Sequence, residues 1–249
     1  MCINNFLDET IQSKYALDQV AIEVTRGCNM GCAHCLRGNA QNINIQHRYI
    51  DSLLQNVENI GSIVFTGGEP SLNIDAIDYT LQKCQELNIS VGSFYIVTNG
   101  KENVLPLCVS ALKWYAYCDE REMCGLALSR DKFHAAIAPD NESILRGLAF
   151  FVEDKFTDFD RVNLVSEGRA EGLNGYKKTD VDMHCDSWSF EEYDGVTYVG
   201  GMVYLSANGE IRDNCDTAFD NLEYTIGDLN HDTFDYLVKS QSIGETLPF

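Results

Sequence analysis

The sequence predicts an α/β fold: a partial (βα) barrel of about five or six parallel strands with a small C-terminal β-hairpin extension. Three observations lead to this prediction. Short β-branched runs alternate with helical stripes of about 10–15 residues, which is typical of βαβ units. Polar or glycine-rich segments follow five consecutive strand candidates. After residue 180 the helical stripes give way to strand candidates around Asn208-Gly209, a type I′ hairpin signal.

The strand candidates of the barrel are short, apolar and rich in β-branched residues. They lie at residues 20–24, 62–66, 93–98, 124–129 and 161–166. Between them, apolar residues recur at helical spacing over residues 50–57, 74–84, 104–117 and 144–152. Asp140 or Asn141 is the expected N-cap of the last helix. In parallel sheets the chemistry lies at the carboxyl ends of the strands, so the segments after these strands are the first candidates for a site.

Length and composition fit one large domain or two small ones. The 249 residues are 45% hydrophobic by count, enough to bury a sizeable core. No run of about 18 apolar residues occurs, so no membrane-spanning helix is expected. Residues 1–150 have a formal net charge of −6 and residues 151–249 one of −14. We therefore predict a core domain over residues 18–170 and an acidic extension over residues 171–249.

Charge and cysteine content narrow the function classes. A formal net charge of −20 argues against a protein that wraps nucleic acid or lies on an anionic membrane. The first residues show neither a basic start nor a long apolar stretch, which favours the cytoplasm over secretion. In a reducing compartment, ten cysteines indicate metal binding before disulfides.

Three cysteines, Cys28, Cys32 and Cys35, form a C-x3-C-x2-C pattern directly after the first strand candidate. Their thiolates can converge on one soft metal centre. A zinc site would take His34 or His47 as its fourth ligand, whereas an ordinary iron–sulfur centre would need a fourth cysteine. No further cysteine follows nearby, which favours an iron–sulfur cluster with one iron left open.

A second motif, G-G-E-P at residues 67–70, follows the second strand candidate. With both motifs in this order, the chain resembles the radical S-adenosylmethionine (SAM) superfamily over at least residues 20–170. The resemblance implies that the three cysteines hold three irons of a [4Fe–4S] cluster, whose open iron binds SAM. It also implies reductive cleavage of SAM to a 5′-deoxyadenosyl radical, which abstracts hydrogen from a substrate. An electron donor such as flavodoxin or ferredoxin would reduce the cluster.

The resemblance further implies which residues contact SAM. Gly67 and Gly68 would let the backbone approach the methionine part closely. Glu69 would accept hydrogen bonds from the amino group, and Pro70 would stiffen the turn. His34, just before the last cysteine, would stack on the adenine, although other aromatic residues are commoner there.

Polar residues after later strand candidates fall at the same rim. Asn99, Ser129 and Arg130 would contact the ribose and carboxylate of SAM, unless they serve ordinary turns. His134 would face the substrate as an acid or base, or else be an ordinary loop histidine. Two more residues, Glu167 and Arg169, would bind SAM or a substrate carboxylate. For Arg37, after the cluster motif, we expect a solvated side chain.

The hairpin candidate resembles the cysteine-bearing SPASM or twitch extension of many radical SAM enzymes. Cys185 and Cys215 flank it, but no cysteine follows Cys215. An auxiliary iron–sulfur cluster would therefore need other ligands, and the alternative is a remnant of that extension without a cluster. The candidates for these ligands are His184, Asp216, His231, Cys118 and Cys124.

The resemblance to that extension implies a peptide side chain as the substrate of the predicted enzyme, by analogy with the family alone. Two alternatives within the superfamily are a glycyl-radical-enzyme activase and an enzyme that acts on a small molecule. An alternative of another class is a non-catalytic iron–sulfur sensor or scaffold. The intact G-G-E-P motif argues against that alternative.

Overall fold

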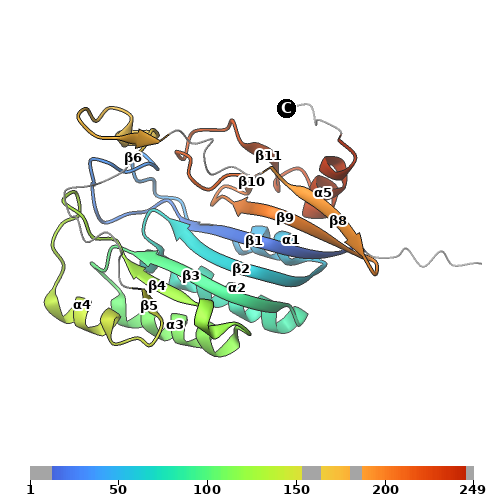
Figure 1. The fold of residues 1–249 in the computed structure, drawn as a ribbon, viewed down its shortest axis with the longest axis horizontal. Coiled ribbons are helices and arrows are strands. Elements are labelled where there is room, and N and C mark those ends of the chain that lie inside the picture. Colours follow the sequence, from blue (N-terminus) through green and yellow to red (C-terminus); the bar gives the residue numbers. More distant parts are fainter. Residues whose placement is uncertain (1–12, 153–163, 180–186, 245–249) are drawn as a thin grey trace, which may run out of the picture.

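In the computed structural model, which describes residues 13–152, 164–179 and 187–244, a nine-stranded sheet carries the fold (Figure 1). Six neighbouring strands run parallel in the order β9-β1-β2-β3-β4-β5, which confirms the predicted α/β class. These strands are β1 (Lys14–Thr25), β2 (Val57–Gly67), β3 (Ser90–Thr98), β4 (Gly125–Leu128), β5 (Phe151–Val152) and β9 (Val196–Leu205).

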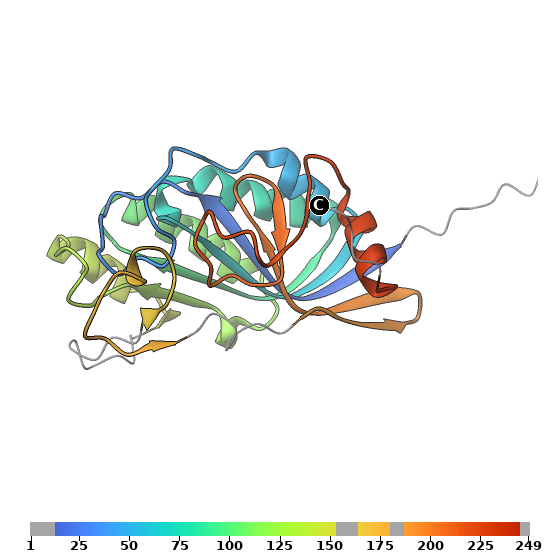
Figure 2. The ribbon, with the colours of Figure 1, turned by 90° about the horizontal axis from the view of Figure 1, so that it is seen from above.

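Helices pack mainly on one face of this sheet, as Figure 2 shows for α1, α2 and α3. Trp114 of α3 is fully buried there, with its ring centroid 5.1 Å from that of Phe65 in β2. The aromatic pair therefore joins the helix layer to the middle of the sheet. The helices are α1 (His47–Leu54), α2 (Ile74–Leu87), α3 (Val104–Tyr117), α4 (Pro139–Arg146) and α5 (Phe234–Ser242). None of the described helices is long and apolar enough to cross a membrane.

Two predicted helices are shorter than their apolar stripes suggested. Asn56 takes a left-handed φ of 69° after α1, so Val57 begins β2 instead of continuing the helix. The prediction that Phe151 belongs to a helix is likewise wrong, because α4 ends at Arg146 and Phe151 lies in β5. In both places the first apolar residue of the next strand falls at helical spacing in the sequence, so the pattern predicts one helical turn too many. The expected N-cap at Asp140 or Asn141 is also wrong, since α4 starts at Pro139.

The predicted fifth strand, residues 161–166, does not extend the main sheet where the structure describes it. Leu164–Val165 (β6) pairs with Lys178–Thr179 (β7) in a separate two-stranded sheet. Residues 161–163 lie outside the described residues. The fifth parallel strand is the short β5 instead, which pairs with β4.

The C-terminal hairpin is confirmed, and it is part of the main sheet. Its turn is not the predicted type I′ turn, which needs a positive φ at both Asn208 and Gly209, because Asn208 does not have one. Gly209 takes a φ of 94° at the turn, and β10 (Glu210–Arg212) returns antiparallel to β9. On its other side β9 pairs with β1 in parallel, with Leu205 opposite Ile22. The main sheet thus spans the predicted boundary near residue 170. Two further strands, β8 (Ser189–Tyr193) and β11 (Thr225–Asp228), pair antiparallel with β9 and β10.

Candidate active site

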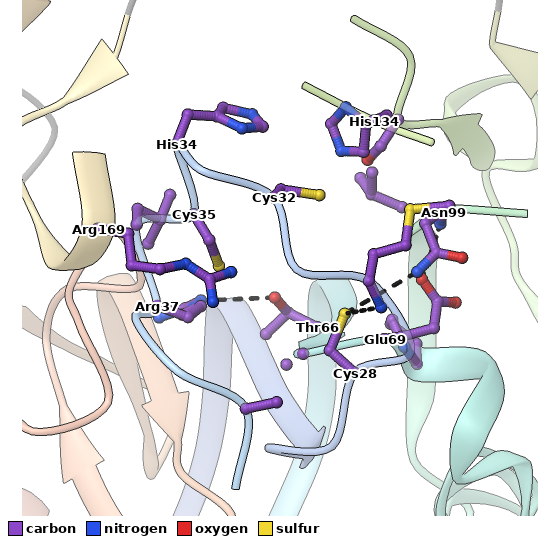
Figure 3. A pocket seen from close by; sticks show the side chains of 18 of the residues that line it. Cys28, Cys32, His34, Cys35, Arg37, Thr66, Glu69, Asn99, His134 and Arg169 are labelled. Carbon is purple, nitrogen blue, oxygen red and sulfur yellow. Dashed lines mark hydrogen bonds between the residues drawn. The ribbon is translucent and has the colours of Figure 1, made fainter. Parts of the chain in front are cut away.

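A pocket of about 610 Å³ lies at the carboxyl ends of the parallel strands (Figure 3). Arg169 lines it, whereas Glu167, which was also predicted to bind SAM or a substrate carboxylate, is not among its lining residues. All the other residues that the sequence placed at the cluster and SAM site line it, because parallel strands end at one edge of their sheet. These residues are Cys28, Cys32, His34, Cys35, Gly67, Gly68, Glu69, Pro70, Asn99, Ser129 and Arg130.

The three cysteines of the motif lie on an irregular loop after β1. Hydrogen bonds from Cys35 N to Cys32 O and from Gly38 N to Cys35 O, each 3.2 Å, fold the loop into two successive turns. Each of the three thiols is half-buried and free of disulfides. Burial raises the pKa of the Cys28 and Cys32 thiols, so metal binding there would release protons.

The pocket fits a [4Fe–4S] cluster with one open iron. Its three thiols are one fewer than the four ligands of a closed cluster. Buried polar atoms around them also lack partners among the described residues: His34 Nδ1, Asn29 Nδ2 and Arg169 Nε make no hydrogen bond. A polar ligand beside the cluster would provide such partners.

The two glycines of the G-G-E-P motif allow the end of β2 to pack closely against the backbone that leads into the cysteine loop. Gly68 N donates to Thr25 O over 2.8 Å. A Cβ on Gly68 would come within 2.2 Å of Gly27 O, and one on Gly67, at a φ of 137°, within 2.1 Å of Thr25 O. The missing side chains therefore make room for the cysteine loop. Their contact with SAM stays a prediction.

Glu69 is almost fully buried, with 1% of its surface exposed, and its carboxylate joins neighbouring strand ends. One oxygen accepts hydrogen bonds from Thr98 Oγ1 (2.6 Å) and Ser71 N (3.1 Å), and the other accepts from Asn99 N (2.7 Å). A carboxylate has about four acceptor positions, so one remains for a ligand amino group. Pro70 begins the short 3-10 helix η1 (Pro70–Leu72) directly behind it.

Asn99, Ser129 and Arg130 follow β3 and β4 as predicted. The Asn99 amide donates to Asn29 Oδ1 over 2.8 Å and lies 4.0 Å from Cys28 Sγ, so it lies against the cysteine loop. Ser129 N donates to Thr98 O over 2.8 Å. The Arg130 guanidinium is exposed and forms an ion pair with Glu142 at 2.6 Å.

His34 and His134 meet at the rim through Asp131. His34 Nε2 lies 3.1 Å from one Asp131 oxygen, and His134 Nδ1 lies 2.8 Å from the other. The His34 ring also stacks on Phe133 at 4.6 Å. Burial lowers the pKa of His34, which favours its neutral ring. Donor atoms of His34, Asp131 and His134 lie within 4.8 Å of one another, and this group contains no cysteine. The zinc site of three cysteines with His34 or His47 stays a prediction.

Arg37 is not solvated as expected but buried, with 9% of its surface exposed. Its guanidinium donates to Thr217 O over 2.9 Å and to Thr66 Oγ1 over 3.4 Å, and it lies over the Tyr204 ring at 5.2 Å. The C-terminal extension thus supplies acceptors far along the chain, which local sequence does not reveal. Arg37 ties the cysteine loop to that extension.

Several pocket residues were not predicted at all. Thr66 and Tyr95 line the pocket from β2 and β3. Strand alternation could have found Tyr95, because it lies two residues before Val97 on the same face of β3, and both line the pocket. Phe219 lines the pocket from the C-terminal extension, and no sequence signal marked it. Asp216 lines the pocket too, whereas the sequence had offered it only as a ligand of the auxiliary cluster.

The predicted auxiliary cluster stays a prediction. Cys215 is half-buried, with its sulfur 3.9 Å from Asp216 Oδ1, whereas Cys185 and His184 lie outside the described residues. Cys118 and Cys124 are buried in the core at the amino end of β4, the end opposite the pocket. His231 is exposed in the loop before α5.

The family model of the Radical SAM superfamily matches residues 22–148, just over half of the 249 residues. Among curated proteins, the chain is similar to the uncharacterized protein MJ0907 of Methanocaldococcus jannaschii, with 34% identity over 74 residues. That segment covers 28% of this chain and 26% of the relative.

Two solved structures are distantly similar. Native anSMEcpe with bound AdoMet and Cp18Cys peptide has 11% identity and a TM-score of 0.48, over 93% of this chain and 82% of that one. Streptococcus suis SuiB bound to precursor peptide SuiA has 22% identity and a TM-score of 0.34, over 55% of this chain and 31% of that one. We therefore base the function on the family and the pocket, not on these structures.

Proposed function

The chain belongs to the radical SAM superfamily, and on that basis we propose that it is an enzyme that cleaves SAM reductively at a [4Fe–4S] cluster. Cys28, Cys32 and Cys35 hold the cluster in this proposal and leave one iron open. One observation carries it: three free thiols and the G-G-E-P motif line the same pocket, although they lie on loops after different strands.

When bound, the cluster and SAM supply a 5′-deoxyadenosyl radical, which abstracts a hydrogen atom from the substrate. The chain's own residues bind and orient. The remaining acceptor position of Glu69 would take the amino group of SAM, and the Asn99 amide, which lies beside Cys28, would take its ribose. His34 offers a neutral ring to the adenine, and Ser129 and Arg130 close the rim.

We also propose a peptide side chain as the substrate. The C-terminal hairpin and the segment after it support this, because Asp216 and Phe219 form one wall of the pocket. A reducing cytoplasmic setting and an electron donor such as flavodoxin or ferredoxin belong to the same proposal, since free thiols persist there.

The test is anaerobic reconstitution followed by addition of dithionite and SAM, with 5′-deoxyadenosine measured by chromatography. The intact chain should bind about four irons and form 5′-deoxyadenosine. Cys32→Ala should lose both iron and product. Cys108→Ala, which alters a buried core cysteine on α3, is the matched control and should retain both.

The outcomes separate the alternatives. If the intact chain binds the cluster but forms no 5′-deoxyadenosine, the proposed enzyme function is excluded and the iron–sulfur sensor or scaffold remains. Clearly more than about four irons per chain would indicate the auxiliary cluster at Cys185 and Cys215. If 5′-deoxyadenosine forms, activation of a glycyl-radical enzyme or turnover of a small molecule, in place of a peptide, would replace only the proposed substrate.

A further inference from the structure

Arg169 reaches the cysteine loop from a distant part of the chain. It lies in the 3-10 helix η3 (Gly168–Ala170), and its backbone N donates to Cys35 O over 3.0 Å. Gly168 has a φ of 53°, and a Cβ there would come within 2.3 Å of Leu36 O and 2.6 Å of Gly38 N. The turn that carries Arg169 is therefore pressed directly against the cysteine turn.

The same turn is held from its other side by Glu167. One Glu167 oxygen accepts a hydrogen bond from Ala218 N over 2.8 Å, and the other accepts from Asn221 Nδ2 over 2.9 Å. The segment 217–221 is itself tied to the cysteine loop, because Phe219 N donates to Arg37 O. The backbone of Arg169 is thus held by the cysteine loop on one side and by the segment 217–221 on the other, which limits where its guanidinium can lie.

The guanidinium of Arg169 points toward the three thiols (Figure 3). Its hydrogen bond to Asn39 is a long one, 3.4 Å from Nη1 to Oδ1, and its buried Nε makes no hydrogen bond to any described residue. By contrast, Arg26 is paired with Glu23 and Arg130 with Glu142. In the part of the chain that the structure describes, no carboxylate forms an ion pair with Arg169.

We propose that Arg169 sets the reduction potential of the cluster, because a fixed cation beside the cysteine thiolates stabilises the added electron. The inference rests on the proposed function, since it needs a cluster at these cysteines. Reduction adds one electron from the donor and hence one negative charge, with no bond made or broken. A cation held in a partly buried pocket is poorly screened, so its effect on that charge is strong. Cluster potentials respond to net charge and solvent exposure in this way.

The test is a redox titration of the reconstituted protein without SAM, followed by electron paramagnetic resonance. At a fixed solution potential, Arg169→Gln should lower the ratio of reduced to oxidised cluster about tenfold. For one electron this corresponds to a decrease of about 59 mV in the reduction potential of the cluster. Arg169→Lys keeps the charge and should stay close to the intact protein. Arg121→Gln is the matched control, because Arg121 lies in η2 (Arg121–Met123) at the amino end of β4 and donates to Ala116 O. It should leave the ratio unchanged.

If Arg169→Gln binds no cluster, a second variant still tests the inference. Glu167→Gln weakens the support of the turn without touching the cysteines and should shift the ratio in the same direction by a smaller factor. Loaded variants at both positions with the potential of the intact protein would overturn the inference while leaving the proposed function standing. Failure of the intact protein to load a cluster would instead overturn the proposed function.

Discussion

At the scale of single residues, Glu69 shows how one side chain serves both the fold and the site. The sequence identified it as an acceptor for a ligand amino group. The structure adds that its carboxylate accepts three hydrogen bonds, one from Ser71 in η1 and two from Thr98 and Asn99 at the end of β3. A buried carboxylate with such donors holds the strand ends in register, so its removal affects stability as well as ligand binding.

We expect Glu69→Ala to lower the free energy of unfolding by about 2–3 kcal/mol, because it leaves the buried N–H groups of Ser71 and Asn99 without acceptors. Urea unfolding followed by circular dichroism measures this change. Glu58→Ala removes an exposed carboxylate paired with Lys14 and should cost no more than about 0.5 kcal/mol. Equal stability of the two variants would contradict the role given to Glu69.

At the scale of elements, the end of β2 and the cysteine loop depend on each other. Gly67 and Gly68 lie where the two backbones are too close for any side chain. Gly31, in the same loop, has open space at its Cα, and a methyl group added there would meet nothing within 4 Å. Substitution by alanine should therefore have opposite effects at the two kinds of glycine, those without room for a side chain and the one with open space.

Gly68→Ala should push the cysteine loop away from β2, lower the free energy of unfolding by about 1–3 kcal/mol and reduce iron loading. Gly31→Ala should change stability by less than about 0.5 kcal/mol and load iron normally. Iron content after reconstitution and urea unfolding measure both effects. If the two alanine variants load iron equally, the close packing of β2 on the loop has no part in forming the site.

At the scale of the whole molecule, the sheet joins the two predicted domains. β9 covers the edge of β1 that β2 leaves open, and the two strands pair in parallel along most of β1. The C-terminal segment also forms a wall of the pocket. Residues 18–170 therefore contain the motifs of the site but leave an exposed edge strand without residues 171–249.

A chain shortened to residues 1–170 should aggregate or lack a cooperative unfolding transition, because β1 would expose unpaired backbone groups. Size-exclusion chromatography and urea unfolding test this, with the full chain as the control. A monomeric, cooperatively unfolding fragment would show that the predicted core is an independent domain.

The docking of α5 on β1 predicts a pH dependence. Tyr15 OH donates to Asp235 Oδ1 over 2.7 Å, and Lys239 forms an ion pair with the same carboxylate at 2.8 Å. Burial alone would raise the pKa of Asp235, but these hydrogen bonds outweigh it and lower the pKa below its ordinary value of 3.8. The contribution of Asp235 is thus present above the unfolded pKa and is lost as the pH falls through the lower, folded pKa.

The free-energy difference between the intact protein and Asp235→Asn should therefore shrink as the pH falls below about 4. Urea unfolding at a series of pH values measures it. Lys113→Met, which breaks an exposed ion pair with Asp78 elsewhere, is the control for general acid effects. A difference that does not change with pH would contradict the contribution assigned to the Asp235 carboxylate.

Much of this protein could be predicted from local pattern. Cysteine spacing, the G-G-E-P motif and the alternation of strands with helices depend on neighbouring residues. They predicted the α/β class, the bounds of α3 and the chain segments that meet in the pocket. Chain topology explains this success, because successive parallel strands must end at one edge of their sheet, whatever their exact lengths.

Only the tertiary structure decided which residues surround that pocket from far along the chain. Arg37 is buried because Thr217 accepts its hydrogen bond. The sequence placed Arg169 at the rim, but only the folded chain shows that its backbone N donates to Cys35 O, so that η3 packs on the cysteine turn. The pairing of β9 with β1 likewise joins segments that no local pattern connects. These contacts depend on how distant segments pack, so they became visible only when the chain was folded.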